Sequence, residues 1–293
     1  MKILIVGATG MIGHTLWMGL SLNHDVSVII RKDKKQLPNI PKIENTQIFD
    51  NIDVLDFDNV DHVISIIKPD VVFNCIGIVK QLEISSNHQV CIALNSLFPH
   101  QLAQACARSN SRMIQFSSDC VFDGEKGMYV ESDTPNATDL YGRTKALGEI
   151  DYLSNVLTLR TSFIGREIFP HGGLVNWFES QKGGAIRGFS NAIYSGLPTN
   201  TFVKILNNFI LPNKNLHGIY HLSAAPIDKY YLLNLIKKQF KVDVEIELDK
   251  TFVIDRSLIS DKFKSETGFE PLVWEELIKD LEINSEFYKE IEQ

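Results

Sequence analysis

The chain opens with a short apolar run followed by three glycines, each three residues after the last. Lys2–Ala8 is predicted to be a buried strand, and Gly7, Gly10 and Gly13 lead into an amphipathic helix, Met11–Asn23. Gly7 permits a tight turn, Gly10 lets backbone N–H groups approach a ligand, and Gly13 lets the helix pack against the strand. Because the helix N-terminus then faces bound phosphates, the loop predicts a dinucleotide-binding βα unit.

Apolar runs and amphipathic stretches alternate through the first half of the chain. The further strands predicted there are Asp25–Arg31, Gln47–Phe49, Asp70–Gly77, Arg112–Ser118 and Val156–Thr161. The helices predicted between them are Phe57–Lys68, Leu140–Leu153 and Ser86–Asn110, the last bent at Pro99. Strands that are apolar on both faces and alternate with helices indicate an α/β fold, a doubly wound parallel (Rossmann) sheet with right-handed crossovers.

Glycines break this pattern into shorter pieces after residue 163. The later elements are predicted as strands Gly218–Ser223 and Asp243–Leu248 and helices Ile227–Phe240, Ser257–Thr267 and Trp274–Ile283. We therefore expect residues 1–163 to form an NAD(P)-binding domain and residues 164–293 a smaller, mixed α/β substrate domain. Strand 218–223 has the option of rejoining the sheet of the first domain.

Composition excludes several classes of protein. The chain carries 36 acidic and 29 basic residues, a net charge of −7, which argues against a general nucleic-acid binder or a polybasic membrane anchor. No apolar run reaches the roughly 18 residues of a membrane helix, and the N-terminus does not resemble a signal peptide. Four cysteines without a C-x-x-C spacing favour neither disulfides nor a metal site. We expect a cytoplasmic protein.

The second predicted strand ends in basic residues. NAD-specific sites usually carry an acid there, whereas Arg31 and Lys32 suit the 2′-phosphate of NADP. Asp53, after the third strand, is a candidate to hold the adenine amine, and a solvated surface role is the alternative for all three. The other expected cofactor contacts lie in the glycine loop and after the third and fourth strands: Thr9, Gly10, Met11, Ile12, Val54, Cys75, Ile76 and Gly77. We expect NADPH, with NADH as an option.

Tyr141 and Lys145 begin a predicted helix at a spacing that places both on one face. A cation beside a phenol favours the phenolate and should draw the tyrosine pKa down from about 10, so that the phenol exchanges a proton with a substrate oxygen. Ser118 ends the fifth strand, where ligands bind in open α/β sheets, and either binds that oxygen or caps a turn. Asn95, inside the long helix, either holds a water near Lys145 or relieves a helix bend.

Seven segments of the chain carry a family resemblance: Gly7–Gly13, Phe116–Gly124, Tyr129–Pro135, Tyr141–Glu149, Leu159–Ser162, Ser195–Thr199 and Asp255–Leu258. Together they resemble the extended short-chain dehydrogenase/reductases, and within these the dTDP-4-dehydrorhamnose reductase-like group of nucleotide-sugar reductases. The resemblance implies a catalytic Ser118, Tyr141 and Lys145, a nucleotide-sugar substrate, and reduction of a 4-keto group by a nicotinamide cofactor.

Two positions depart from the family pattern. Cys120 stands where members carry a tyrosine near the sugar, and Phe163 stands where a tryptophan is frequent. With these, Asn74–Gln81 and Ser190–Tyr194 look more like a subgroup that reduces UDP-linked 2-acetamido-2,6-dideoxy-4-keto-hexoses for surface polysaccharide synthesis.

A nucleotide diphosphate needs cations and a stacking surface. Lys80, Arg187 and Arg256 are the candidate substrate cations, each with a solvated surface role as its alternative. Trp177, Phe178 and Phe189 are candidates to stack on the base but are more typical of a core. Lys229, on a late helix, is expected to face solvent.

Two other functions remain open at this point. An epimerase on the same scaffold would retain bound NAD, whereas a 4,6-dehydratase is disfavoured because Cys120 replaces the glutamate of its Thr-Asp-Glu run. The second is a non-catalytic dinucleotide-binding regulatory subunit, such as the partner of methionine adenosyltransferase. Pairing into a homodimer is common in this fold family, and the sequence leaves the oligomeric state open.

Overall fold

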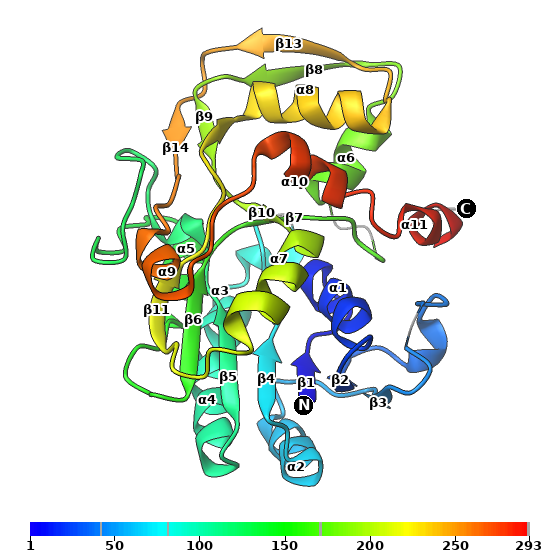
Figure 1. Cartoon of the computed structure of the whole chain (residues 1–293), viewed down its shortest axis with the longest axis vertical. Coiled ribbons are helices and arrows are strands. Elements are labelled where there is room, and N and C mark those ends of the chain that lie inside the picture. The colour runs from blue at the N-terminus through cyan, green and yellow to red at the C-terminus, as the bar shows by residue number, and fades with distance from the viewer. Residues whose placement is uncertain (42, 81, 170–171, 292–293) are drawn as a thin grey trace.

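The structure is a computed structural model that describes residues 1–41, 43–80, 82–169 and 172–291 (Figure 1). Within them a seven-stranded sheet has the order β11-β6-β5-β4-β1-β2-β3. Its strands are β1 (Lys2–Val6), β2 (Asp25–Ile29), β3 (Gln47–Phe49), β4 (Val71–Asn74), β5 (Arg112–Phe116), β6 (Val156–Arg160) and β11 (Gly218–His221). All neighbouring pairs are parallel, which confirms the predicted doubly wound sheet, and the later strand does rejoin it.

Both faces of the sheet are covered by helices, which explains why its strands are apolar throughout. Along β1, Ile3 and Ile5 enter the core on one face, while Leu4 and Val6 enter the core on the other. The first core is closed by α1 (Met11–Leu20) and α7 (Thr199–Ile205), and the second by α2 (Phe57–Ile67) and α4 (Phe98–Arg108). The alternation of side chains along a strand thus divides one apolar run between two cores.

The long helix expected at Ser86–Asn110 is divided into several parts. They are η2 (Glu83–Ser86), α3 (His88–Cys91), the π-helical η3 (Ile92–Leu97) and α4. The helical backbone runs without a break from η3 into α4, and the π turn directly before Pro99 accommodates a residue that has no N–H to donate. Single π turns frequently occur at functional sites, and this one contains Asn95.

The later part of the chain lies mostly beyond the carboxyl ends of the main strands (Figure 1). It forms small sheets from β7 (Phe163–Ile164) with β10 (Leu197–Pro198), β9 (Ala192–Tyr194) with β12 (Ile227–Asp228) and β14 (Ile254–Asp255), and β8 (Ala185–Phe189) with β13 (Glu245–Asp249). Its other helices are α6 (Leu174–Ser180), η5 (Leu206–Ile210), α8 (Lys229–Phe240), α9 (Asp261–Thr267), α10 (Trp274–Asp280) and α11 (Ser285–Ile291). The remaining elements are η1 (Lys34–Gln36), η4 (Asp119–Val121) and α5 (Leu140–Leu147).

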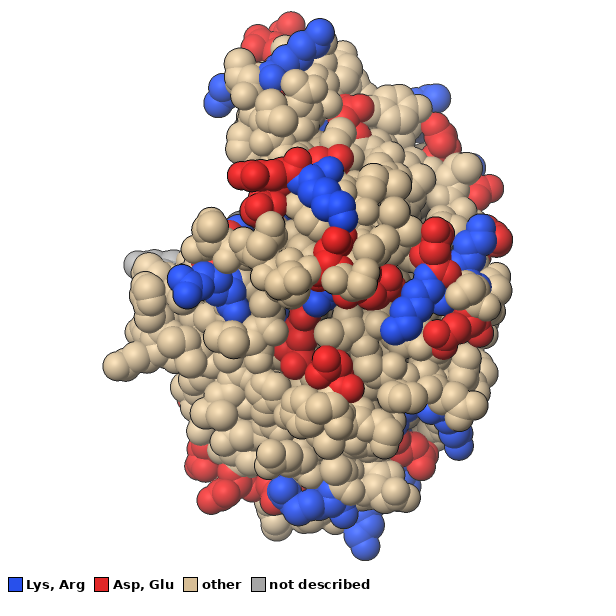
Figure 2. Space-filling view, turned by 90° about the vertical axis from the view of Figure 1, so that its left-hand side faces the viewer, with Lys and Arg blue, Asp and Glu red and all other residues tan. Residues whose placement is uncertain are grey.

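Helices in the described part of the chain are too short or too polar to cross a membrane. On the face shown in Figure 2, Lys and Arg side chains are interspersed with Asp and Glu rather than gathered in one basic strip. That face therefore has no extended field of a single sign.

Candidate active site

A cleft of about 430 Å³ lies at the carboxyl ends of β1, β4, β5 and β6. Its lining includes the glycine loop, the segment after β4, the β5 end with η4, and the start of α5: Thr9, Gly10, Met11, Ile12, Cys75, Ile76, Gly77, Lys80, Ser118, Asp119, Cys120, Tyr141 and Lys145. Parallel α/β sheets bind ligands at this edge, so the cleft is the candidate site. Gln81, at the end of one family-like segment, lies outside the described residues.

The glycine loop has the shape that a pyrophosphate requires. Gly7 has a φ of +85°, and a Cβ there would lie 2.7 Å from the Ile76 side chain. A Cβ on Gly13 would collide with the Gly7 carbonyl, whereas one on Gly10 would meet only that oxygen, at 3.6 Å. Gly10 caps α1 without a side-chain hydrogen bond, so the first N–H groups of the helix have no capping side chain. These features fit a bound dinucleotide.

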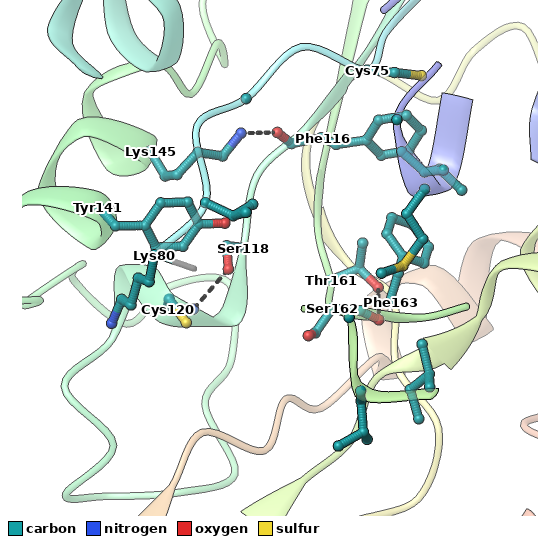
Figure 3. Close-up of a pocket in the computed structure, with 18 of the residues that line it drawn as sticks. Cys75, Lys80, Phe116, Ser118, Cys120, Tyr141, Lys145, Thr161, Ser162 and Phe163 are labelled. Atoms are coloured by element: carbon teal, nitrogen blue, oxygen red, sulfur yellow. Dashed lines mark hydrogen bonds between the residues drawn. The ribbon is translucent and has the colours of Figure 1, made fainter. Parts of the chain in front are cut away.

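Ser118, Tyr141 and Lys145 form one side of the cleft, with Ser162 and Phe163 on the other (Figure 3). Tyr141 and Lys145 lie one turn apart on α5, which Asp139 caps by accepting a hydrogen bond from the Gly142 N–H at 3.0 Å. Lys145 Nζ donates to the Phe116 carbonyl at 2.5 Å. Ser118 Oγ accepts from the Cys120 N–H at 3.1 Å and donates to Asp119 Oδ1 at 3.0 Å. Ser118 therefore both caps η4 and lines the cleft.

Burial dominates the proton equilibria on this side of the cleft. It raises the pKa of Tyr141 well above its usual range, against an opposing hydrogen bond with Ser118. The expectation that Lys145 draws the pKa of Tyr141 toward neutrality is therefore wrong for the chain alone. Burial also lowers the pKa of Lys145 to about 8, and the Glu149 carboxylate opposes that shift. At neutral pH the phenol holds its proton and can act as an acid.

Asn95 joins two parts of the site through its side-chain amide. Its Oδ1 accepts from the Ile78 N–H at 2.9 Å, and its Nδ2 donates to the Ile78 carbonyl and to Thr144 Oγ1. A Cβ on Gly77 would lie 3.6 Å from Asn95 Oδ1 and 3.9 Å from Lys145 Nζ. Asn95 thus fixes the segment after β4 against α5, close to Lys145.

A buried ion pair lies behind the catalytic candidates. Arg160 donates to both Glu149 oxygens at 2.8 Å, and the two side chains are only 3% and 6% exposed. Ser117 Oγ donates to the same carboxylate at 2.6 Å. Through Glu149, which lies four residues after Lys145, this network connects the ends of β5 and β6 to the end of α5. Sequence reasoning missed it, although the Tyr141–Glu149 segment contains the glutamate.

The candidate substrate residues separate into two groups. Lys80 and Cys120 line the cleft, and Lys80 forms an ion pair with Asp139 at 2.8 Å. Arg256 lies behind Cys120, where it donates to the sulfur at 3.5 Å and to the Phe122 carbonyl at 2.9 Å. Arg187 does not lie in the cleft: alternation along β8 turns it outward, and it pairs with Asp249.

The aromatic residues considered as stacking candidates also lie outside the cleft. Phe178 is fully buried in the core, Trp177 is 38% exposed on α6, and Phe189 packs against Phe252. Among the described residues, the aromatic rings that line the cleft are those of Phe116, Tyr141, Phe163, Phe169 and Tyr194.

None of the residues expected at the adenosine end lines the cleft itself, although Lys32 lies against its wall. Arg31 is exposed, and Lys32 Nζ lies 3.8 Å from the ring centre of Phe169, a residue of the cleft wall. Asp53 accepts from the Leu55 N–H within its own turn, and Val54 is buried in the core. The described residues contain no group of three or more side chains suited to hold a metal ion.

Lys229 was expected to face solvent, and this is wrong. It lines the cleft, with Nζ 4.8 Å from the ring centre of Tyr194, which lines it too. Pairing of Ile227 with Tyr194 between β12 and β9 brings the two together. The helix begins two residues later than expected, because Asp228 caps it by accepting from the Tyr231 N–H. Asp228 is a residue type typical of an N-cap, and this was the sequence signal that could have placed the start of the helix at Lys229.

Comparisons with known proteins agree with this geometry. The family model described as RmlD substrate binding domain matches residues 1–175. A dTDP-4-dehydrorhamnose reductase of Aggregatibacter actinomycetemcomitans is 28% identical over 243 residues, 78% of this chain and 76% of that protein. A crystal structure of dTDP-4-dehydrorhamnose reductase from Bacillus anthracis in complex with NADP has a TM-score of 0.75, at 18% identity, over 97% of this chain and 99% of that one.

A second kind of relative also matches. Methionine adenosyltransferase 2 subunit beta of Bos taurus is 33% identical over 159 residues, which are 53% of this chain and 44% of the bovine protein. The chain thus spans less than half the length of this relative. The family model covers more than half of the chain and confirms the resemblance seen in the sequence motifs. This protein belongs to the RmlD substrate binding domain family.

Proposed function

We propose that the protein reduces the 4-keto group of a nucleotide-linked 6-deoxyhexos-4-ulose with NADPH. One observation carries this proposal: Ser118, Tyr141 and Lys145 converge on one side of a cleft that the glycine loop also lines. A proton donor, a hydrogen-bonding hydroxyl and a dinucleotide site in one cleft are what carbonyl reduction requires.

The bound cofactor supplies the hydride. Tyr141, whose phenol stays protonated, donates its proton to the oxygen of the reacting carbonyl. Ser118 turns its one hydroxyl hydrogen from Asp119 Oδ1 to that oxygen when the sugar binds, while the Cys120 N–H continues to hold Oγ in place. Lys145 is held by the Phe116 carbonyl near Gly77, and its ammonium group donates to the cofactor ribose.

The cofactor preference rests on charge at the rim. Arg31 and Lys32 follow β2 and are exposed, so both can pair with a 2′-phosphate. The Bacillus anthracis reductase with the same fold is described in complex with NADP. NADPH is therefore the favoured cofactor, with NADH accepted. On this proposal residues 1–163 bind the cofactor and residues 164–293 the sugar nucleotide.

The substrate is proposed from the departures at Cys120 and Phe163, both of which line the cleft. They argue against the dTDP-linked 4-keto-rhamnose precursor, and Cys120 together with the segments 74–81 and 190–194 favours a UDP-linked 2-acetamido-2,6-dideoxy-4-keto-hexose. Such a product would serve the synthesis of a surface polysaccharide.

The test is NADPH oxidation measured in parallel with dTDP-linked and UDP-linked 4-keto-6-deoxy sugars. Turnover of either series supports the reductase, and faster turnover of the UDP-linked acetamido sugar supports the finer assignment. Absence of turnover with both series contradicts the proposal. Dinucleotide that stays bound through gel filtration, without net NADPH oxidation, would indicate an epimerase instead.

The similarity to methionine adenosyltransferase 2 subunit beta supports a second candidate, a dinucleotide-binding subunit of another enzyme. Retention of Ser118, Tyr141 and Lys145 in one cleft favours the reductase. Stoichiometric co-purification with a partner enzyme, combined with no turnover of any keto sugar, would reverse that preference.

A further inference from the structure

Two side chains from the later part of the chain face the cleft that holds Ser118 and Tyr141. Tyr194 ends β9 and Lys229 begins α8, and both line the cleft. Lys229 belongs to none of the family-like segments, and Tyr194 is the last residue of the Ser190–Tyr194 segment. We call this pair the Lys229–Tyr194 subsite.

Lys229 brings a cation into the cleft, and none of the described residues forms a hydrogen bond with it. Its Nζ lies 4.8 Å from the centre of the Tyr194 ring and forms no hydrogen bond or ion pair with any residue that the structure describes. Burial lowers the pKa of Lys229, and the charge of Asp119 opposes that shift. An ammonium group withdrawn from water is costly unless an acceptor meets it.

Tyr194 adds a second unmatched donor. The residue is 8% exposed, and its buried hydroxyl forms no hydrogen bond of good geometry with the described residues, although the Ser162 side chain lies close enough to act on it. A Cβ on Gly196 would collide with that hydroxyl, so the glycine gives it room. Buried hydroxyls are nearly always hydrogen-bonded, which points to a ligand acceptor here.

The surroundings of the pair indicate what the ligand group is. The charge of Lys229 acts on Asp119 and Cys120, the two residues after Ser118, so the subsite lies near the reacting carbon. Asp119 is only 8% exposed and accepts from Ser118, and its carboxylate would repel a phosphate. A neutral oxygen acceptor meets both donors without that repulsion.

We propose that Lys229 and Tyr194 bind an oxygen substituent of the hexose, a hydroxyl or an amide carbonyl, close to the carbon that is reduced. This inference rests on the proposed function, because it assumes that a nucleotide sugar occupies the cleft. It makes Lys229 a specificity residue for the sugar, distinct from the cations that serve the diphosphate.

The experiment is equilibrium binding by calorimetry, with UDP-N-acetylglucosamine, UDP-glucose and UDP as stable probes. Lys229→Met should weaken binding of the sugar-bearing nucleotides about 10- to 100-fold, the range for a lost hydrogen bond to a charged group. Affinity for UDP and for NADPH should not change. A loss confined to the acetamido sugar assigns an amide carbonyl, and an equal loss with both sugars assigns a shared hydroxyl.

Lys238→Met is the matched control, since Lys238 is exposed on the same helix. Tyr194→Phe removes a single oxygen atom, should cost about 2- to 10-fold, and serves as the test if the Lys229 variant does not fold. Unchanged affinities, or an equal loss for UDP alone, would overturn the inference. Absence of keto-sugar reduction together with intact Lys229-dependent sugar binding would contradict the proposed function alone.

Discussion

The two sides of the cleft differ in how they are built. Ser118, Tyr141 and Lys145 come from one strand end and the next helix, and hydrogen bonds to neighbouring residues hold Ser118 and Lys145 in place. Lys229 and Tyr194, on the other side, come from segments joined by the antiparallel pairing of β12 with β9, and their polar ends form no hydrogen bond of good geometry within the described chain.

The difference teaches how one scaffold serves both chemistry and selectivity. Groups that act on a transition state must be held in place before the substrate arrives, so their hydrogen bonds are made within the protein. Groups that select a substrate need hydrogen-bond donors that the protein itself does not use. A ligand that leaves such a buried donor unpaired binds more weakly than one that accepts its hydrogen bond. The first side should govern turnover, and the second side should govern affinity.

Tyr141→Phe tests the first side and has the largest expected effect. It removes the proton donor but leaves the shape of the cleft, so kcat should fall by about 10²- to 10⁴-fold while NADPH affinity changes little. Steady-state kinetics and cofactor titration measure the two quantities. Tyr152→Phe is the control, because Tyr152 is exposed, lies outside the cleft lining and is hydrogen-bonded through its hydroxyl to the half-buried His100. Turnover that survives in the Tyr141 variant would remove Tyr141 from the mechanism.

Glu149→Gln tests the support behind that side. It leaves the Arg160 guanidinium buried beside a neutral amide, which should lower the free energy of unfolding by about 3–5 kcal/mol. Urea titration followed by circular dichroism measures it. Asp61→Asn breaks the exposed Arg108–Asp61 pair and should cost less than about 1 kcal/mol. Equal losses in the two variants would show that the buried pair contributes no more to the free energy of unfolding than the exposed pair does.

Sequence patterns predicted the first side well and the second side poorly, for a physical reason. The glycine loop and the Tyr141–Lys145 spacing are contiguous, and the parallel sheet brings their segments to one edge. The place of Lys229 depends on the pairing of Ile227 with Tyr194, which no local pattern specifies. Arg187 was misplaced for the converse reason: its glycine-rich surroundings suggest a loop, whereas it lies on the outward face of β8.

His14 offers a test of the contact between the N-terminal helix and the last helix. Its Nε2 lies 2.8 Å from the Tyr288 hydroxyl and its Nδ1 lies 2.8 Å from the Gly10 carbonyl, which suits the neutral ring. Burial lowers the pKa of His14 to about 4 from 6.5. The unfolded chain therefore binds the proton more readily, and stability is lost as pH falls from about 6.5 to about 4.

The loss due to His14 should reach roughly 3 kcal/mol below that range. It is measured as the difference in pH dependence of unfolding between the wild type and His14→Gln. The control is His62→Gln, at an exposed position, which should keep the wild-type slope. Identical slopes in wild type and the His14 variant would show that this contact does not depend on a neutral histidine.

Arg31→Ala has the smallest expected effect and extends the comparison to the cofactor rim. Arg31 is exposed, so a pair with a 2′-phosphate is screened by water, and its loss should weaken NADPH about tenfold while NADH is unaffected. The measurement is the dissociation constant for NADH divided by that for NADPH, which should be smaller in the variant than in the wild type. In the wild type this ratio should also fall as salt is added. Lys35→Ala, at an exposed position four residues on, is the matched control. An equal loss for NADH would show that Arg31 acts on the shared part of the dinucleotide, and preference for NADPH would then have to come from Lys32.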